Sequence, residues 1–298
     1  MPEQLLSKVM VTGAAGQLGS ALCLSAPSSV DVCALSRTDC DICDPAAVEA
    51  ALDAQRPQLV INAAAYTAVD RAEEDSAAAF AANAEAPGVL ARACAARGIR
   101  FFHVSSDFVF DGSRSSPYPV DALTAPLGVY GQSKQAGEQA TLNSGADCLV
   151  LRTGWVYSHD GQNFMHTMLR LHGSHDEISV VSDQVGTPTD AISLAGALWA
   201  AADRPGLSGI YHWSDAGVCS WYDFALAIGE EAYALGLLTN LAAVKPIRTE
   251  DYPTPAQRPA YSVLDKTQSW QDFDILPTHW RSQLRVVLTR LKEADHHA

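Results

Sequence analysis

Short apolar runs alternate with longer stretches of helical periodicity through the first half of the chain. Runs this short, rich in Val, Ile and Leu, are typical of strands buried on both faces of a parallel sheet. Strands are expected at residues 9–12, 30–35, 59–61, 100–104 and 148–152. Helices are expected from 20 to about 26 and at 45–55, 69–97 (in two pieces) and 129–142. The alternation indicates right-handed βαβ units, so the predicted fold class is α/β with a Rossmann-like, doubly wound parallel sheet.

The pattern changes beyond residue 161. Further helices are expected at 163–171 and 221–238, strands at 178–181 and 209–213, and a proline-fixed extended segment at 253–259. We expect residues 1–160 to form the Rossmann-like domain, completed by later segments. Residues 161–298 then form mainly a smaller, discontinuous α/β lobe that shares strands with the main sheet.

A glycine-rich turn separates the first strand from the first helix. Gly13, Gly16 and Gly19 follow a G-x-x-G-x-x-G spacing, not the G-x-G-x-x-G of many dehydrogenases. Glycines here let the backbone approach a pyrophosphate, whose charge is met by the helix N-terminus. The position between strand and helix therefore predicts a nucleotide site.

The end of the second expected strand bears on the choice of cofactor. An Asp or Glu there would bind the ribose 2′-hydroxyl and favour NAD, but this chain has Ser36 and Arg37. A hydroxyl and a guanidinium suit a 2′-phosphate, so NADPH is the predicted cofactor, with NADH possible. The alternative is a solvated loop arginine. Asp41 and Ile42 are expected to border the adenine.

Two further strand ends contribute candidate ligands. The third strand leads into small residues against which a cofactor could lie, followed by two polar ones: Ala63, Ala64, Ala65, Tyr66 and Thr67. The fourth strand delivers Ser105, Ser106 and Asp107 at its carboxyl end, where open α/β sheets bind ligands.

Tyr130 and Lys134 form a Tyr-x-x-x-Lys pair on the expected helix at 129–142. Spacing of four residues puts both side chains on one helical face. A nearby cation favours the phenolate, so we expect the pKa of Tyr130 to fall and proton exchange with a sugar oxygen to become feasible. The alternative is a packed tyrosine and a solvated lysine.

Composition narrows the class of protein. The chain has 298 residues, 48% of them hydrophobic and 18% charged, with a net charge of −14. This excludes a disordered chain and opposes binding to nucleic acid or to anionic membranes. No apolar run reaches the roughly 18 residues of a membrane span, and residues 1–7 lack signal-peptide features. We therefore expect a soluble, cytoplasmic protein.

Seven scattered cysteines suit free thiols in a reducing compartment. Cys40 and Cys43 form a C-x-x-C pair, but no second pair accompanies it, so no metal site is predicted.

Eight stretches together carry a family resemblance: 13–19 (GAAGQLG), 62–70 (NAAAYTAVD), 105–111 (SSDFVFD), 129–134 (VYGQSK), 152–157 (RTGWVY), 163–164 (NF), 183–189 (DQVGTPT) and 252–259 (YPTPAQRP). In this order they resemble the extended short-chain dehydrogenase/reductase superfamily and, more narrowly, the dTDP-4-dehydrorhamnose reductase family. The resemblance covers nearly the whole chain.

The resemblance implies a role for each matching residue. Tyr130 would be the proton donor, Lys134 would bind the nicotinamide ribose and tune Tyr130, and Ser106 would hydrogen-bond the reacting oxygen. The pyrophosphate would be met by Gly16, Gln17 and Leu18, and the rest of the cofactor by Ala65, Tyr66, Thr67 and Val104. The sugar would contact Ser106, Asp107 and Trp155, and the nucleotide or its diphosphate would lie near Asn163 and Arg258.

Three departures from the family pattern limit how far the family's residue roles apply to this chain. Ser106 stands where Thr is common, which preserves the hydroxyl, and Phe108 stands where Tyr is common, which removes a polar contact. Some relatives use an acidic residue after the glycine turn in a metal-linked dimer. Ser20 and Ala21 supply no such ligand, so neither that metal nor that metal-linked dimer is carried over to this chain. A monomer or a homodimer is expected.

The expected activity is NADPH-dependent reduction of the 4-keto group of dTDP-4-dehydro-L-rhamnose to dTDP-L-rhamnose. The first domain would bind NADP and the smaller lobe the nucleotide sugar. Another nucleotide-sugar reductase, epimerase or dehydratase is an alternative. A dehydratase would normally have more than one acidic residue beside Ser106, where this chain has only Asp107. A regulatory NADP-binding subunit of the methionine adenosyltransferase type is a second alternative. Trp155 as a core aromatic and Arg258 as a surface residue are the alternatives at those positions.

Overall fold

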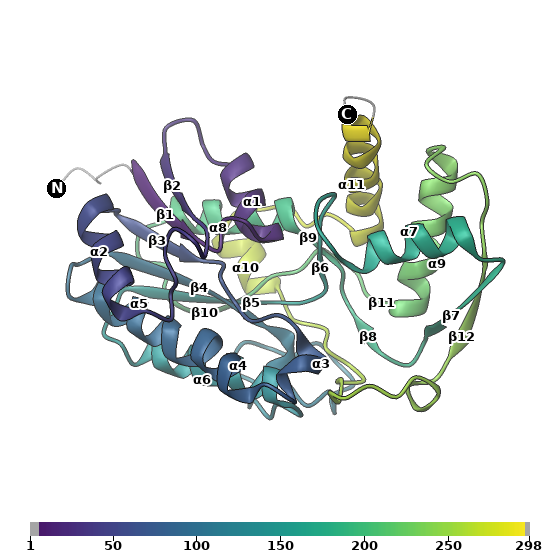
Figure 1. The fold of residues 1–298 in the computed structure, drawn as a ribbon, viewed down its shortest axis with the longest axis horizontal. Coiled ribbons are helices and arrows are strands. Elements are labelled where there is room, and N and C mark those ends of the chain that lie inside the picture. Colours follow the sequence, from purple (N-terminus) through teal and green to yellow (C-terminus); the bar gives the residue numbers. More distant parts are fainter. Residues whose placement is uncertain (1–5, 296–298) are drawn as a thin grey trace.

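A six-stranded parallel sheet forms the centre of the computed structural model, which describes residues 6–295 (Figure 1). Its strands lie in the order β10-β5-β4-β3-β1-β2. They are β1 (Lys8–Thr12), β2 (Asp31–Leu35), β3 (Leu59–Asn62), β4 (Arg100–Ser106), β5 (Cys148–Thr153) and β10 (Gly209–His212). The predicted Rossmann-like parallel sheet is confirmed.

Helices cover both faces of this sheet, which explains why its strands read as apolar runs. One face packs against α1 (Gln17–Leu24) and α8 (Ala191–Ala202), in a core that includes Val9, Ile61, Leu151 and Trp199. The other face packs against α2 (Pro45–Gln55) and α5 (Ala86–Ala95). The predicted catalytic helix, α6 (Val129–Leu142), lies beside α5.

The alanine-rich stretch before β4 forms two pieces, as predicted. The first is α3 (Val69–Ala72). The second runs without a break from α4 (Ser76–Phe80) through a π-helical turn (Ala81–Glu85) into α5. Such single π turns are frequent at functional sites, and this one contacts α6.

Much of the second half of the chain forms a separate apolar cluster, on the right of Figure 1. Its core combines Met165, Phe224, Ile228, Leu284 and Leu288. The helices of this lobe are α7 (Phe164–Ser174), α9 (Trp221–Ala234) and α11 (Trp280–Asp295), and its paired strands are β7 (Glu177–Val181) with β12 (Ala243–Ile247), β6 (Val156–Tyr157) with β9 (Thr189–Asp190), and β8 (Val185–Gly186) with β11 (Cys219–Ser220).

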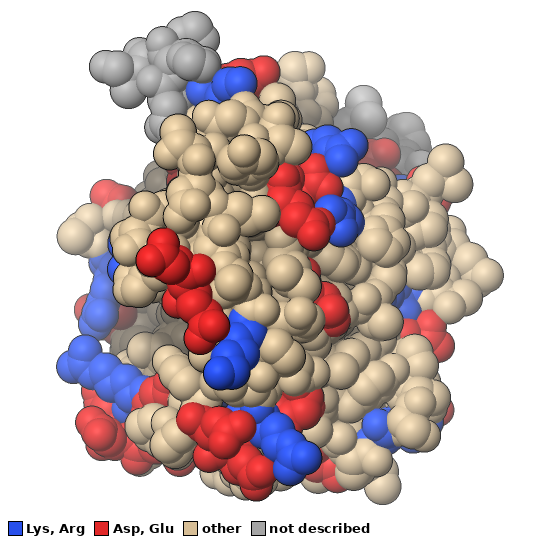
Figure 2. All heavy atoms as spheres, turned by 90° about the vertical axis from the view of Figure 1, so that its right-hand side faces the viewer, with Lys and Arg blue, Asp and Glu red and all other residues tan. Residues whose placement is uncertain are grey.

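Later segments complete the main sheet. β10 pairs with β5, α8 packs on α1, and α10 (Thr267–Asp272) lies against β10. The smaller α/β lobe is thus discontinuous in sequence, while the boundary at residue 160 stays a prediction. On the face shown in Figure 2, acidic and basic side chains are interspersed and no broad basic patch forms.

The strand order places a ligand site. β1 has β2 on one side and β3 on the other, so the connections that leave their carboxyl ends diverge between β1 and β3. Open α/β sheets bind ligands at such a reversal. The glycine turn follows β1, and the residue 62–67 loop follows β3, so both line this position.

Candidate active site

The glycine turn needs its glycines for steric reasons. Gly13 has φ +71°, and a Cβ there would lie 2.6 Å from the backbone of Ala64. A Cβ on Gly19 would clash with the carbonyl oxygen of Gly13. Gly16 is the N-cap of α1 and supplies no side-chain cap, and the first turn carries no acidic residue. The N–H groups at this end of α1 are therefore available to an anion.

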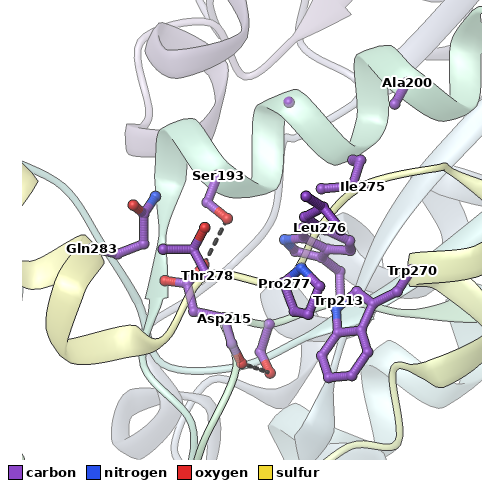
Figure 3. A pocket seen from close by; sticks show the side chains of 12 residues that line it. Ser193, Ala200, Trp213, Asp215, Trp270, Ile275, Leu276, Pro277, Thr278 and Gln283 are labelled. Atoms are coloured by element: carbon purple, nitrogen blue, oxygen red, sulfur yellow. Dashed lines mark hydrogen bonds between the residues drawn. The ribbon is translucent and has the colours of Figure 1, made fainter.

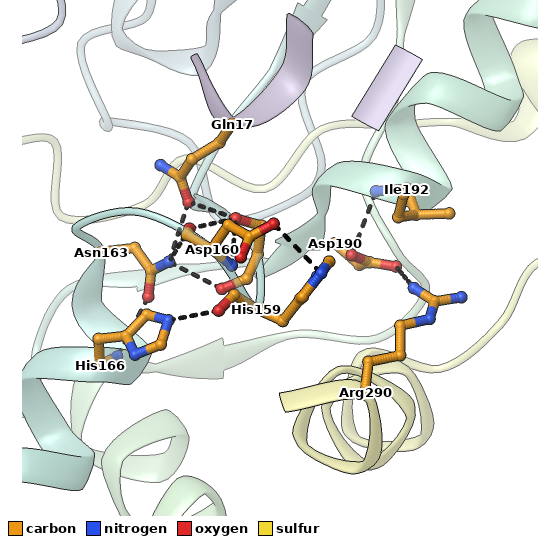
Figure 4. Close-up of polar contacts among 9 residues, drawn as sticks. Gln17, His159, Asp160, Asn163, His166, Asp190, Ile192 and Arg290 are labelled. Carbon is orange, nitrogen blue, oxygen red and sulfur yellow. Dashed lines mark hydrogen bonds and ion pairs between the residues drawn. The ribbon is translucent and has the colours of Figure 1, made fainter. Parts of the chain in front are cut away.

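Gln17 joins the turn to the loop before α7 (Figure 4). Its Oε1 accepts hydrogen bonds from Ser158 Oγ at 3.1 Å and from Asn163 Nδ2 at 2.9 Å. Asn163 also caps α7, because its Oδ1 accepts from the backbone N–H of His166. Asn163 therefore lies next to the predicted pyrophosphate position. Leu18 is buried in the core, so only its backbone can meet a cofactor.

Arg37 is the exposed group at the end of β2. Its side chain is 86% exposed, and its Nε lies 3.4 Å from the Asp41 carboxylate. Ser36 turns toward Asp39, to which both its backbone N–H and its hydroxyl donate. Exposed ion pairs are weak, so a phosphate could draw Arg37 from Asp41. Ile42 is buried beside Asp41.

Asn83 holds the loop that follows β3. Its Oδ1 accepts from the backbone N–H of Tyr66 at 2.8 Å, and its Nδ2 donates to the Tyr66 carbonyl and to Ser133 Oγ. Ser133 lies on α6, so the π turn ties the loop to the catalytic helix. Sequence reasoning missed Asn83, whose only signal in the sequence was an amide side chain within an alanine-rich stretch. In the same loop, Ala65 and Thr67 are exposed.

Lys134 and Tyr130 lie together at the carboxyl end of β4, but their electrostatics differ from the prediction. Lys134 is 2% exposed, donates to the Val104 carbonyl at 2.7 Å, and has its pKa lowered to about 8 by burial. Burial raises the pKa of Tyr130 to about 12, against a lowering hydrogen bond from Ser106. The expected fall in the pKa of Tyr130 is therefore wrong, because desolvation of the phenolate dominates and Lys134 turns to Val104.

Ser106 and Asp107 adjoin Tyr130. Ser106 Oγ lies 3.1 Å from an oxygen of Asp107, and burial raises the pKa of Asp107 to about 6. The Phe108 ring meets Tyr130 edge-on, with centroids 5.6 Å apart. The structure thus brings Ser106, Asp107, Tyr130 and Lys134 together.

Trp155 is held in an unusual backbone conformation. Its φ is +51°, and its indole stacks on Trp221 with centroids 3.5 Å apart and planes at 4°. A Cβ on Gly186 would lie 2.6 Å from this indole, so glycine is needed beneath it. Non-glycine residues with positive φ cluster at functional sites. Trp221 was not predicted as a site residue, because only the folded chain brings it against Trp155.

Arg258 already has protein partners. Its guanidinium binds both carboxylate oxygens of Asp70, at 3.0 and 2.8 Å, and also donates to Thr254. Two of the recognised motifs, 62–70 and 252–259, therefore meet through this ion pair. A contact from Arg258 to a nucleotide stays a prediction.

Several buried polar atoms near these residues have no hydrogen-bond partner within residues 6–295. They are Tyr66 Oη, Ser105 Oγ and Thr153 Oγ1. Thr153 lies opposite Ser106 in the pairing of β4 with β5. Thr153 and Ser106 therefore lie on the same side of the sheet, where a polar ligand would give the unpaired Thr153 hydroxyl a partner.

A separate cavity of about 280 Å³ lies along α8 (Figure 3). Trp213, Asp215, Trp270 and Pro277 are among its lining residues, and none of the predicted site residues is. Within residues 6–295 no group of three or more His, Cys, Asp or Glu side chains is placed to hold a metal ion, and no helix is long and apolar enough to cross a membrane.

Comparison with known proteins places the chain in a family. The family model for the RmlD substrate binding domain matches residues 7–293. The chain belongs to the RmlD family. The resemblance found in the motifs is thereby confirmed, and so is the predicted enzyme class, since several relatives that match nearly the whole chain are named dTDP-4-dehydrorhamnose reductase.

Three relatives illustrate the similarity of this RmlD family member. The dTDP-4-dehydrorhamnose reductase of Aggregatibacter actinomycetemcomitans is 40% identical over 95% of this chain and 98% of its own. A probable dTDP-4,6-dihydroxy-2-methyloxan-3-one 4-ketoreductase of Streptomyces antibioticus is 41% identical over 96% of both chains. The crystal structure of Bacillus anthracis dTDP-4-dehydrorhamnose reductase in complex with NADP is 33% identical, with a TM-score of 0.89, over 96% of this chain and 100% of that chain.

Proposed function

We propose that this protein reduces the 4-keto group of dTDP-4-dehydro-L-rhamnose to dTDP-L-rhamnose with NADPH. The observation that carries the proposal is the convergence of Tyr130, Lys134 and Ser106 at the carboxyl end of β4. The family and the names of the relatives support the substrate class.

The residues present fit a dinucleotide. The uncapped end of α1 and the tight approach of Gly13 to Ala64 suit a pyrophosphate, and Tyr66 Oη is a buried hydroxyl without a partner in the described chain. Lys134 would bind the nicotinamide ribose, and Arg37 with Ser36 would meet a 2′-phosphate. Asp41 and Ile42 would border the adenine. When bound, NADPH supplies the hydride that C4 of the sugar receives.

Tyr130 supplies the proton. Its pKa of about 12 keeps the phenol protonated at neutral pH, so it can donate to the carbonyl oxygen as that oxygen gains charge. The C4 carbonyl becomes an alcohol, and Tyr130 becomes a phenolate that the Lys134 ammonium stabilises. The Ser106 hydroxyl would donate a second hydrogen bond to the same oxygen.

The sugar would lie between the end of β4 and the smaller lobe. Asp107 and the Trp155–Trp221 stack would contact it, because Asp107 follows Ser106 and Trp155 lies just after β5, stacked on the first residue of α9. Asn163 donates to Gln17, and Arg258 donates to Asp70. Either side chain would therefore contact the nucleotide only by sharing its N–H donors between that partner and the ligand. The cytoplasmic location and the monomeric or homodimeric state stay predictions.

The test is oxidation of NADPH, followed by absorbance, with dTDP-4-dehydro-L-rhamnose generated in situ. We expect turnover by the wild type and a loss of at least about 10²-fold in Tyr130→Phe and Lys134→Met, because the proton donor and its cation are removed. Tyr233→Phe is the matched control, since Tyr233 is exposed on α9.

Two outcomes would overturn the proposal. Turnover of Tyr130→Phe at the wild-type rate would exclude Tyr130 as the proton donor. Absence of wild-type turnover, with NADPH still bound, would point to another 4-keto nucleotide sugar, such as the substrate class named for the Streptomyces relative, or to a regulatory cofactor-binding role.

A further inference from the structure

A buried ion pair lies directly beneath the predicted catalytic groups. Arg152 donates from Nε to Glu138 Oε1 at 2.8 Å and from Nη2 to Glu138 Oε2 at 2.7 Å. Their side chains are 3% and 4% exposed. This is the two-pronged geometry in which arginine and carboxylate bind most strongly.

Glu138 continues the catalytic face of α6. Tyr130, Lys134 and Glu138 are spaced four residues apart, so their side chains follow one another along one side of the helix. Arg152 lies on β5, directly before Thr153, which is paired with Ser106. The ion pair therefore connects α6, which carries the proposed proton donor, to β5, the strand that pairs with the end of β4 where Ser106 lies.

Arg152 is fixed on its other sides as well. It donates to the Val120 carbonyl at 3.2 Å, its guanidinium lies 5.1 Å from the centroid of the Phe110 ring, and His212 Nε2 is 3.4 Å away. These contacts come from the 111–126 loop, from the segment after β4 and from β10. Arg152 is therefore held by three other parts of the chain while it binds the Glu138 carboxylate.

We propose that Glu138, held by Arg152, is a positioning residue for Lys134: its carboxylate keeps the buried Lys134 ammonium charged and aimed at the Val104 carbonyl and the cofactor site. The catalytic part of this inference rests on the proposed function. The effect on Lys134 itself does not.

The electrostatics around Lys134 support the assignment. Burial lowers the pKa of Lys134, and the charge that opposes this lowering is that of Glu138. The other titratable groups that face Lys134 or its helix are Tyr130, His103 on β4, Asp107 after β4, Arg152 on β5, and Glu73, which accepts from the first N–H of α6. All of these except Arg152 are kept in the variants below.

Stability alone does not explain the pair. Buried ion pairs often contribute little net stability compared with apolar residues of similar size, whereas removing one partner leaves an uncompensated charge. The informative variant is therefore Glu138→Gln/Arg152→Met, which removes both charges and leaves neither partner buried alone. Arg152→Lys is the conservative variant, because it retains a cation for Glu138.

The first measurement is a titration of lysine side chains by NMR in protein labelled with ¹³C-lysine. The chain has five lysines, Lys8, Lys134, Lys245, Lys266 and Lys292, and Lys134→Met identifies the signal of Lys134. We expect the pKa of Lys134 to fall by about one pH unit in Glu138→Gln/Arg152→Met, because the charge of Glu138, one helical turn away, is the one that raises this pKa. Arg152→Lys should leave it near its wild-type value.

Lys266 is an internal control in the same spectra. Its pKa is also lowered to about 8 by burial, but its partners are Asp215 and Asp265. It should titrate alike in all variants. An unchanged pKa of Lys134 in Glu138→Gln/Arg152→Met would overturn the inference, whatever the enzyme's substrate.

The second measurement is the pH profile of kcat. Because the ammonium form of Lys134 is the active one, a fall of about one pH unit in its pKa moves the alkaline limb to lower pH and lowers kcat at pH 8 roughly five-fold. The matched control is Glu231→Gln/Arg281→Met, which removes charges from another ion pair, between α9 and α11. This control should keep the wild-type profile.

The outcomes separate the two proposals. If wild-type protein does not reduce the keto sugar, the proposed function fails, and the NMR titration still decides the link between Glu138 and Lys134. If the wild type reduces the keto sugar and Glu138→Gln/Arg152→Met keeps the alkaline limb of the kcat profile at the wild-type pH, Glu138 has only a structural role and the inference is wrong.

Discussion

Arg37 is the exposed residue that we propose to bind the 2′-phosphate of the cofactor. Its guanidinium is exposed to solvent and forms an ion pair with the Asp41 carboxylate, with Nε 3.4 Å from a carboxylate oxygen. An exposed pair of this kind contributes little to stability. Removing Arg37 should therefore affect the cofactor and leave the fold intact.

We predict that Arg37→Ala lowers kcat/KM for NADPH about ten-fold and leaves kcat/KM for NADH unchanged, because one charge-assisted contact to the 2′-phosphate is lost. Steady-state kinetics with both cofactors measure this. Arg56→Ala is a suitable control, since Arg56 follows α2 at the opposite end of the sheet. Equal losses with NADPH and NADH would contradict a role in phosphate recognition.

At the scale of elements, the π turn at Ala81–Glu85 fixes the loop after β3, residues 62–67, which we propose to contact the cofactor. The wider turn accompanies the inward placement of Asn83, whose amide pairs with both backbone groups of Tyr66 and with Ser133 of α6. Gly137 permits the close approach, because a Cβ there would clash with the carbonyl oxygen of Asn83. One side chain thus sets the distance between the loop and the catalytic helix.

We predict that Asn83→Ala lowers the free energy of unfolding by about 1–3 kcal/mol, because backbone groups of Tyr66 lose their partners. The affinity for NADPH should fall about ten-fold, since the loop loses the geometry in which it meets the cofactor. Denaturant unfolding and fluorescence titration measure the two effects.

The comparison for Asn83 is Asn143→Ala, at the exposed end of α6, which should change stability by less than about 0.5 kcal/mol. Loss of stability in Asn83→Ala without any loss of NADPH affinity would show that the amide only supports packing.

For the whole molecule, buried acids make stability depend on pH in an unusual direction. Asp215 lies between α8 and the segment after β10, where it accepts from Ser193 Oγ at 2.6 Å and from the backbone of Asp190. Burial raises its pKa to about 7. The unfolded chain loses this proton near pH 4 and the folded chain near pH 7, so the contribution of Asp215 to stability falls as pH rises between these values.

We predict that Asp215→Asn is close to wild type in stability near pH 4 and more stable than wild type at pH 7 and above. The gain should grow by about 1.4 kcal/mol for each pH unit within the window, less the cost of the weakened Ser193 contact. Chemical denaturation across this pH range measures it. A difference that does not vary with pH would mean that Asp215 is charged in the folded protein throughout.

Particular residues show how far the sequence could be interpreted. The helix at 129–142 was predicted with the bounds that the structure has, because its periodicity and the flanking Gly128 are local features. Strand β10 was predicted as a strand, and its place beside β5 emerged only on folding. Asn83, Glu138, Arg152 and Trp221 were not identified as site residues, since each acts through a partner at least 14 residues away.

By itself, the sequence determined the order of strands and helices, the glycine turn and the shared face of Tyr130 and Lys134. These depend on periodicity and on spacing over a few residues. Only the tertiary structure decided that the pKa of Tyr130 rises, that Arg258 pairs with Asp70, and that Glu138 pairs with Arg152. The reason is that desolvation and ion pairing depend on which distant groups surround a side chain, and local spacing carries no such information.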